Sequence, residues 1–148
     1  MSDLQSYEDY KALAEQIRLP SAAFINGAYQ AGGGVNMDII NPATGDILTT
    51  IAMTNAETTD YATSKAREAF DKGQWSRCHP AERKEILIRL CKLMTRNRHE
   101  LAVMESLDSG KPIQDCATID LPEAINCIKW HAEAIDKIYD DVAPTGED

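Results

Sequence analysis

Gly110-Lys111, within the stretch LDSGKPIQDC (107–116), is the first place where residue type and spacing could do chemistry. A phosphate-binding loop has a glycine, four residues and then Gly-Lys-Ser/Thr, so that successive backbone N–H groups surround the phosphates. Here the position five before Gly110 is Glu105, which would repel phosphate, and Pro112 stands where Ser or Thr is needed. A glycine with a proline two residues later, as in Gly110-Lys111-Pro112, is instead typical of a helix end. We therefore predict that Gly110 ends a helix.

The triple glycine at 32–34 is a second candidate for nucleotide binding. A dinucleotide fingerprint, G-x-G-x-x-G, would require a further glycine at position 37, which is Met37, and a helix should follow it. The residues that follow alternate between apolar and polar, as in a strand. We therefore interpret the three glycines as a turn.

The thiols are the third candidate, because a catalytic cysteine needs a nearby histidine, cation or helix N-terminus to lower its pKa. Only Cys78-His79 offers such a pair, so Cys78 is the one possible nucleophile among the four cysteines. Cys91 lies on an apolar helical stripe, Cys116 in an expected loop and Cys127 beside an expected buried face. The favoured interpretation is that all four are structural. Zinc is not expected, because the three His and four Cys never approach ligand spacing.

Asp120 has two possible roles. It precedes the last helical pattern, where its carboxylate could accept a backbone N–H as an N-cap. Its second oxygen could also bind a hard monovalent cation beside backbone carbonyl groups. The residues alone leave both roles open.

Composition narrows the classes of protein and of partner. The chain has 148 residues, enough for one domain with a core, and is 43% hydrophobic and 26% charged. Its formal net charge of −9 argues against nucleic acid or an anionic membrane as a partner. No apolar run approaches the ~20 residues that span a bilayer, and no secretory signal begins the chain. Widely spaced cysteines favour a reduced, cytoplasmic protein.

The first third of the chain is expected to contain a helix and a small sheet. The region 1–20 is expected to form an N-terminal helix, because apolar residues follow helical spacing over residues 3–18 and Pro20 stops the run. The region 22–54 is expected to form an antiparallel β-meander of three strands, at 22–29, 35–40 and 47–53.

The region 55–139 is expected to form a layer of four helices, followed at 140–148 by an acidic tail or a truncation point. The first helix should follow a capping box and end at Gly73. Predicted helix starts are a Thr54–Glu57 capping box, Pro80, an Asn97–Glu100 capping box, and Asp120 as N-cap of a helix to about Tyr139.

Five blocks, in this order, resemble the N-terminal part of the NAD(P)-dependent aldehyde dehydrogenase superfamily. They are FINGAY (24–29), INPATGDIL (40–48), AREAFDKGQWSR (66–77), PAERKEILIRL (80–90) and ESLDSGKPIQD (105–115), followed by the final helix (120–145). The final helix is most similar to the branch that oxidises aminoaldehydes, such as gamma-glutamyl-gamma-aminobutyraldehyde in putrescine breakdown. The resemblance spans essentially the whole chain.

The resemblance implies an α/β fold, of which residues 1–148 would be a partial cofactor-binding domain. The helix, the β-meander and the four helices would pack on a Rossmann-like cofactor sheet. The family's nucleophilic cysteine, glutamate base, oxyanion asparagine and cofactor loop come later in the chain than these blocks. A complete member would bind NAD or NADP, oxidise an aldehyde to the acid and form a dimer or tetramer. This chain alone is expected not to be catalytic.

Two sites follow from the same resemblance. Several members hold Na⁺ or K⁺ near the cofactor domain, and the matching ligands here would be the carbonyls of Ile39 or Ile40 together with Asp120. The start of the final helix would lie toward the substrate entrance, near Asn126 and Trp130, although Trp130 is also consistent with an ordinary half-buried aromatic. The alternative to an enzyme fragment is a stand-alone, non-catalytic binding or assembly module.

Overall fold

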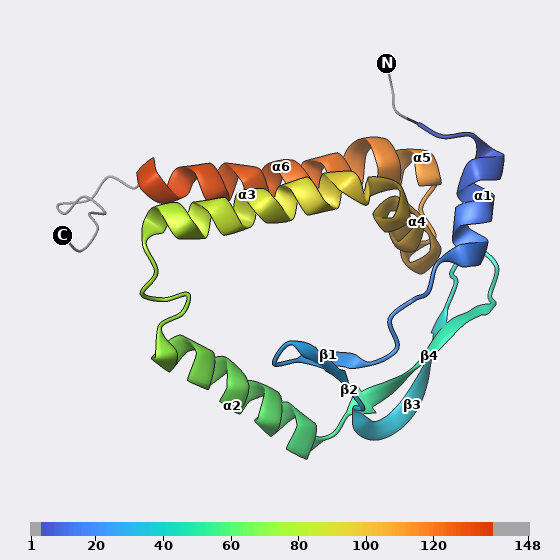
Figure 1. The fold of residues 1–148 in the computed structure, drawn as a ribbon. Coiled ribbons are helices and arrows are strands. Elements are labelled where there is room, and N and C mark those ends of the chain that lie inside the picture. The colour runs from blue at the N-terminus through green and yellow to red at the C-terminus, as the bar shows by residue number, and fades with distance from the viewer. Residues whose placement is uncertain (1–3, 138–148) are drawn as a thin grey trace.

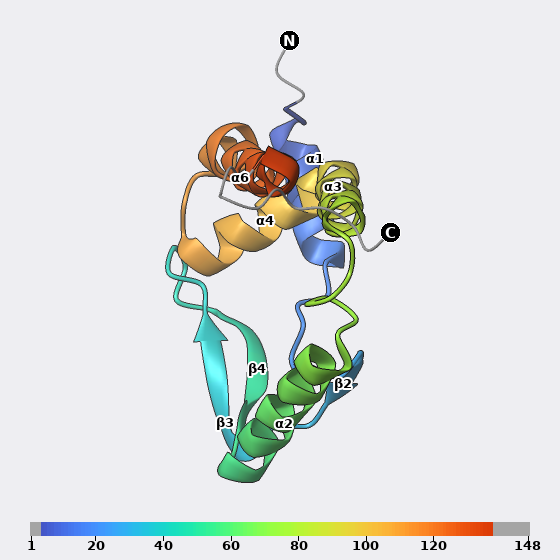
Figure 2. The same cartoon turned by 90° about the vertical axis from the view of Figure 1, so that its left-hand side faces the viewer.

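The computed structural model describes residues 4–137, which form a helical layer above a smaller part made of two hairpins and one helix. In Figure 1 the helices α3 and α6 lie side by side along the top, with α4 and α1 at one end. The strands and α2 lie below them. The turned view in Figure 2 shows the β3–β4 hairpin on one side and β2 with α2 on the other.

The first helix, α1 (Tyr7–Gln16), begins at a capping box. The Ser6 hydroxyl accepts from the backbone N–H of Asp9, and the Asp9 carboxylate accepts from the backbone N–H of Ser6. These contacts satisfy N–H groups that a helix start leaves unpaired. The helix packs on α4 through Tyr10, which is 5% exposed.

The predicted three-strand meander is wrong in its topology, because the strands form two separate two-stranded sheets. The segment expected as one strand at 22–29 is itself a hairpin, with β1 (Ala23–Ile25) antiparallel to β2 (Ala28–Gln30). Asn26 and Gly27 between them have φ of 53° and 82°. Two consecutive left-handed residues of type Asn-Gly make a tight hairpin turn, and that signal was overlooked.

The second hairpin pairs β3 (Gly33–Ile40) with β4 (Ile47–Thr54). The triple glycine leads into β3 and shifts the register there, so it is more than the predicted turn. A Cβ on Gly32 would lie 2.2 Å from the carbonyl oxygen of Ala52, and Gly33 has a φ of 75°. The backbone therefore needs glycine here for a close approach between strands.

The helix α2 (Ala56–Lys72) confirms one predicted boundary and corrects the other. Gly73 ends it in the left-handed conformation, as predicted. Its N-cap is Asn55, whose side-chain oxygen accepts from the N–H of Thr58 at 2.8 Å, so the predicted Thr54–Glu57 capping box is wrong. The helix begins one residue later than that spacing required.

The next two helices are nearly continuous along the chain. Pro80 is the first residue of α3 (Pro80–Arg96), as predicted, and α4 (Arg98–Ser109) follows it. Asn97 lies between the two helices and makes no side-chain capping hydrogen bond, so the second predicted capping box is also wrong. Asn97 is at once the last cap of α3 and the first of α4, with φ of −100° and ψ of 21°, which is not the extended backbone of a usual N-cap.

The last helix begins earlier than predicted. It starts with α5 (Ile113–Asp115), passes through a π-helical turn η1 (Cys116–Asp120), and continues as α6 (Leu121–Ala134) and a 3₁₀ turn η2 (Ile135–Lys137). Cys116, expected in a loop, is 0% exposed inside this helix. The predicted end near Tyr139 and the predicted tail at 140–148 lie outside the described residues.

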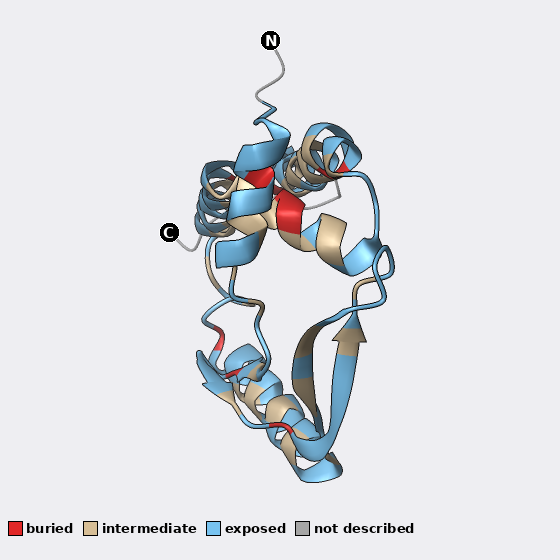
Figure 3. Ribbon diagram, turned by 90° about the vertical axis from the view of Figure 1, so that its right-hand side faces the viewer, coloured by how far each residue is buried: buried red, intermediate tan, exposed pale blue. Residues whose placement is uncertain are grey.

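The helical layer is held together mainly by α3 and α6, which run antiparallel. Cys91 of α3 donates its S–H to the carbonyl of Ile125 in α6 at 3.7 Å, and Lys84 pairs with Asp136 at 2.7 Å. The buried apolar residues are few, and most belong to the helical layer (Figure 3). Along α3 an apolar stripe stays 41–47% exposed, formed by Ile86, Leu90 and Leu93. No helix within residues 4–137 is long and apolar enough to cross a membrane.

Candidate functional site

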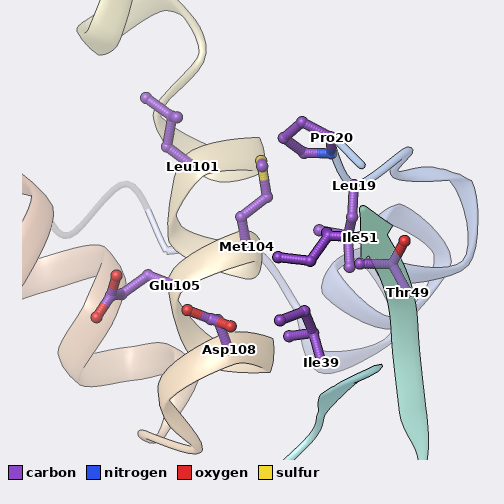
Figure 4. A pocket seen from close by; sticks show the side chains of 9 residues that line it. All are labelled: Leu19, Pro20, Ile39, Thr49, Ile51, Leu101, Met104, Glu105 and Asp108. Atoms are coloured by element: carbon purple, nitrogen blue, oxygen red, sulfur yellow. The ribbon is translucent and has the colours of Figure 1, made fainter. Parts of the chain in front are cut away.

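A hollow of about 430 Å³ lies between the β3–β4 hairpin and α4. Its walls are mostly apolar, and two carboxylates of α4, Glu105 and Asp108, complete them. Figure 4 shows that Asp108 projects toward Ile39, whereas Glu105 points to the opposite side of α4. The lining residues are Leu19, Pro20, Ile39, Thr49, Ile51, Leu101, Met104, Glu105 and Asp108.

The structure thus places Ile39 beside a carboxylate, but that carboxylate belongs to Asp108. Asp120, the expected partner of Ile39 and Ile40, does not line this hollow. Ile40 pairs with Ile47 across the hairpin, after an irregularity in the register between Ile39 and Ile40. Asp108 could not be predicted from the sequence, because the contact joins segments far apart in the chain.

Asp120 instead forms an ion pair. The Nζ of Lys111 donates to Oδ2 of Asp120 at 2.6 Å, and this hydrogen bond raises the pKa of Lys111. Asp120 makes no side-chain capping contact, so the predicted N-cap is wrong. The reason is that the helix already began at Ile113, which leaves Asp120 in the middle of a turn with helical backbone.

No group of three or more His, Cys, Asp or Glu side chains within residues 4–137 has the arrangement of a metal site. A monovalent cation needs fewer side chains, because backbone carbonyls can supply most of its oxygen ligands. Among the described residues, Asp108 makes no ion pair and lines the same hollow as Ile39.

A polar and aromatic face of α6 carries the two residues predicted near the substrate entrance. Asn126 is exposed, and Trp130 is 68% exposed with its ring edge-on to His131 at 4.9 Å. Glu123 is exposed as well, three residues before Asn126 and seven before Trp130, so it lies on the same side of the helix. That spacing was available in the sequence and was overlooked.

The cysteines show no sign of an activated thiol. Cys78 donates its S–H to the carbonyl of Trp75 at 3.2 Å, while the Nδ1 of His79 accepts from the N–H of Ala81 as the cap of α3. Burial raises the pKa of the Cys116 thiol. The arrangement at Cys78 and His79 is therefore that of a helix start.

Gly110 ends α4 in the left-handed conformation, with a φ of 74°, as predicted. A Cβ at this position would lie 3.2 Å from the Cβ of Pro42, in the turn between β3 and β4. The segments NPATG and LDSGKP therefore meet in the fold, at a glycine that allows the close approach.

The comparisons with known proteins agree with this arrangement. Residues 29–148 match the model of the aldehyde dehydrogenase family. The chain belongs to the aldehyde dehydrogenase family. The observed helix, small antiparallel strand pairs and layer of helices match the N-terminal part of the fold in solved relatives, which confirms the expected fold class although the three-strand meander within it is wrong.

Two curated relatives are aldehyde dehydrogenases. One is named for an aminoaldehyde substrate and the other for its dependence on NADP or NAD. Aminoacetaldehyde dehydrogenase of Pseudomonas aeruginosa is 51% identical over 99% of this chain and 30% of its own length. The NADP/NAD-dependent aldehyde dehydrogenase PuuC of Escherichia coli is 40% identical over 95% of this chain and 28% of its own length.

Solved structures give the same result. The aldehyde dehydrogenase KauB of Pseudomonas aeruginosa superposes with a TM-score of 0.89 at 42% identity, over 96% of this chain and 29% of that chain. Gamma-glutamyl-gamma-aminobutyraldehyde dehydrogenase of Burkholderia cenocepacia has a TM-score of 0.86 at 40% identity, over 93% and 28%. An indole-3-acetaldehyde dehydrogenase with a TM-score of 0.88 was solved with NAD⁺. The chain spans about 30% of the length of the curated relatives that it matches.

Proposed function

We propose that this chain forms the N-terminal layer of an NAD(P)-dependent enzyme that oxidises an aminoaldehyde to the carboxylic acid. The observation that carries the proposal is the 51% identity, over nearly the whole chain, to aminoacetaldehyde dehydrogenase. The helices and hairpins would support the cofactor domain and shape the approach to the substrate. The described residues supply neither an activated thiol nor a dinucleotide loop, so the reaction itself would take place on a further part of the enzyme.

The glycine-rich stretch at 32–34 does not fit the dinucleotide. Its backbone is closed by strand pairing, with the carbonyls of Ala52 and Met53 within 2.3 Å of a Cβ placed on Gly32. In this proposal NAD or NADP is held by another part of the enzyme. Assembly into a dimer or tetramer and a cytoplasmic location belong to the same proposal.

The face of α6 formed by Glu123, Asn126 and Trp130 suits an aminoaldehyde. A protonated amine carries positive charge, which a carboxylate attracts and which an aromatic face also favours. Asn126, between them, can donate to or accept from the substrate. In this proposal Glu123 and Trp130 favour substrates with a cationic end over plain aldehydes.

A structural Na⁺ or K⁺ is the second part of the proposal. The carbonyl of Ile39 or Ile40 and a carboxylate would hold it. The lining of the hollow supports Asp108 as that carboxylate, because Asp120 is already paired with Lys111. Asp108→Asn and Asp120→Asn separate the two candidates.

The exposed stripe of α3 favours this proposal over a stand-alone binding module. Ile86, Leu90 and Leu93 follow one another at i, i+4 and i+7, the spacing of a helix face that packs on a neighbour. An independent module would cover such a face itself. In the enzyme, the remainder of the cofactor domain would cover it.

The test is NAD⁺ reduction by the purified protein that contains this chain, with aminoacetaldehyde and with acetaldehyde. We expect the aminoaldehyde to be the better substrate. Glu123→Gln should lower kcat/KM for aminoacetaldehyde about tenfold, the scale of one charged contact, and leave acetaldehyde unchanged. Glu85→Gln, an exposed glutamate of α3, is the matched control. Failure to oxidise either aldehyde would refute the function, whereas equal loss with both aldehydes would refute only the role of Glu123.

A further inference from the structure

A second hollow lies on the other side of α4 and has no part in the proposed function. It has a volume of about 440 Å³ and lies between α1, the β3–β4 turn and the segment after α4. Sites for small molecules usually have a volume of ~300–1,000 Å³. We call it the α1 hollow and define it by Tyr7, Tyr10, Lys11, Val103, Leu107 and Ile113, with Lys111 at the same opening.

The walls of the α1 hollow are fixed before any ligand arrives. Tyr10 is 5% exposed and Val103 is 3% exposed. The hydroxyl of Tyr10 lies 3.1 Å from Nδ1 of His99, and the two rings are in tilted contact with centroids 5.7 Å apart. Because α1 and α4 are joined at this contact, the hollow between them keeps its shape, and a ligand would not need to order it.

The charge of the α1 hollow is opposite to that of the chain. The chain has a net charge of −9, yet the residues that line this hollow include two lysines and no carboxylate. Lys111 is paired with Asp120, which is not part of the lining. Lys11 is exposed and makes no ion pair within residues 4–137. An apolar hollow with an unpaired ammonium group at its edge is complementary to an anion with an apolar body.

We propose that the α1 hollow binds small carboxylates that carry an aromatic or branched aliphatic group. The carboxylate would pair with the Nζ of Lys11, with the exposed hydroxyl of Tyr7 as a further donor. The apolar group would pack on Leu107 and Ile113. The site is separate from the α6 face, since none of Glu123, Asn126 and Trp130 lines it. It uses only residues of this chain and does not rest on the proposed function.

The affinity should be modest. One partly solvated ion pair contributes little, and the hollow is open, so we expect a dissociation constant on the order of 1 mM for a ligand of about ten non-hydrogen atoms. Phenylacetate is a suitable probe, and phenylacetamide has the same shape without the charge.

The experiment is a titration of the full chain with each probe, in which binding is monitored by the NMR chemical shifts of the His99 and Tyr10 rings. We expect saturable shifts with phenylacetate and weak ones with phenylacetamide. Lys11→Gln should weaken phenylacetate binding about threefold to fivefold, the scale of one exposed ion pair. Ala14→Phe, which fills the hollow from α1, should abolish it. Lys92 is an exposed lysine of α3 that makes no ion pair with the described part of the chain, and Lys92→Gln should change nothing.

Three outcomes would overturn the proposal. They are equal binding of phenylacetate and phenylacetamide, unchanged binding by Lys11→Gln, and an equal loss with Lys92→Gln. Lys11 is exposed, so its replacement leaves the fold intact, and the unshifted spectrum of that variant verifies this. The result with Lys11→Gln therefore decides the question even where Ala14→Phe disturbs α1.

Discussion

The ammonium group of Lys111 lies 2.6 Å from Oδ2 of Asp120 and joins the end of α4 to the beginning of α6. This ion pair distinguishes Asp120 from Asp108, two carboxylates that the sequence alone does not distinguish. Asp120 is already paired with Lys111, whereas Asp108 projects toward Ile39 and makes no ion pair within residues 4–137 (Figure 4). A monovalent ion would therefore meet less competition at Asp108.

The first prediction concerns that ion. Replacing choline chloride with NaCl or KCl at constant ionic strength should raise the unfolding midpoint of the protein, because an ion that binds only the folded state stabilises it. Asp108→Asn should abolish this dependence, and Asp120→Asn should retain it. The measurement is thermal unfolding in each salt. Loss of the dependence in Asp120→Asn alone would restore Asp120 as the ligand.

Asp120→Asn has its own expected effect, independent of any added ion. Its partner is about half exposed, so loss of the pair should lower the free energy of unfolding only slightly. The pKa of Lys111 should fall back toward its ordinary value of 10.5. A large loss of stability would mean that Asp120 does more than pair with Lys111.

The second prediction concerns Gly110. Gly110→Ala should lower the free energy of unfolding by about 2 kcal/mol, because alanine is strained at positive φ and its Cβ would press on Pro42. Gly45→Ala is the matched control: Gly45 also has a positive φ, of 80°, but a Cβ there would meet nothing within 4 Å. Gly45→Ala should lower the free energy of unfolding by about 1 kcal/mol. If chemical denaturation gives the same loss of unfolding free energy for Gly110→Ala and Gly45→Ala, then the contact with Pro42 adds nothing to the cost.

The helix boundaries that need a special backbone conformation were predicted well from the sequence. Gly73, Gly110 and Pro80 mark helix boundaries because each has a conformational property that few residues share. Capping carboxylates and hydroxyls were predicted poorly, because the same residue types occur at many positions where no helix begins. Asp120 is an example, since the helix starts at Ile113 and runs past it.

The candidate site was harder to predict than the helices for a related reason. The approach of Ile39 to Asp108 depends on how the β3–β4 hairpin packs on α4, which spacing along the chain does not express. By contrast, Glu123, Asn126 and Trp130 share one helix, so their common face could have been predicted from the helical period. Contacts within an element are readable from sequence, and contacts between distant elements here were not.

The third prediction concerns pH and the docking of α1. Burial, and then the nearby charge of Arg98, lowers the pKa of His99 below its ordinary value of 6.5. Neutral His99 is therefore favoured in the folded state, so its contribution to stability is fully present above pH 6.5 and is lost as the pH falls through the lowered pKa. Hydrogen exchange of residues 7–16 should accelerate over that range.

His99→Gln is the control for this prediction, because it removes the titrating group and keeps a polar side chain at the position. Its exchange rates, corrected for intrinsic pH dependence, should not change between pH 8 and pH 5. Tyr10→Phe keeps the buried ring and removes the hydroxyl that lies 3.1 Å from His99. It should retain the pH dependence. The same acceleration in His99→Gln as in the unmodified protein would locate the titrating group elsewhere.

The fourth prediction ranks the four thiols by access. Cys127 is exposed and Cys78 is half-buried, whereas Cys91 and Cys116 are buried. A thiol reagent must reach the sulfur and meet a thiolate, and burial opposes both, most of all at Cys116, whose pKa it raises. Labelling in the native protein should therefore be fastest at Cys127, slower at Cys78, and negligible at Cys91 and Cys116 until the protein unfolds. Peptide mass analysis of a labelling time course gives all four rates at once. Labelling of Cys78 well ahead of Cys127 would indicate an activated thiol beside His79 and would reopen the possibility of catalysis within this chain.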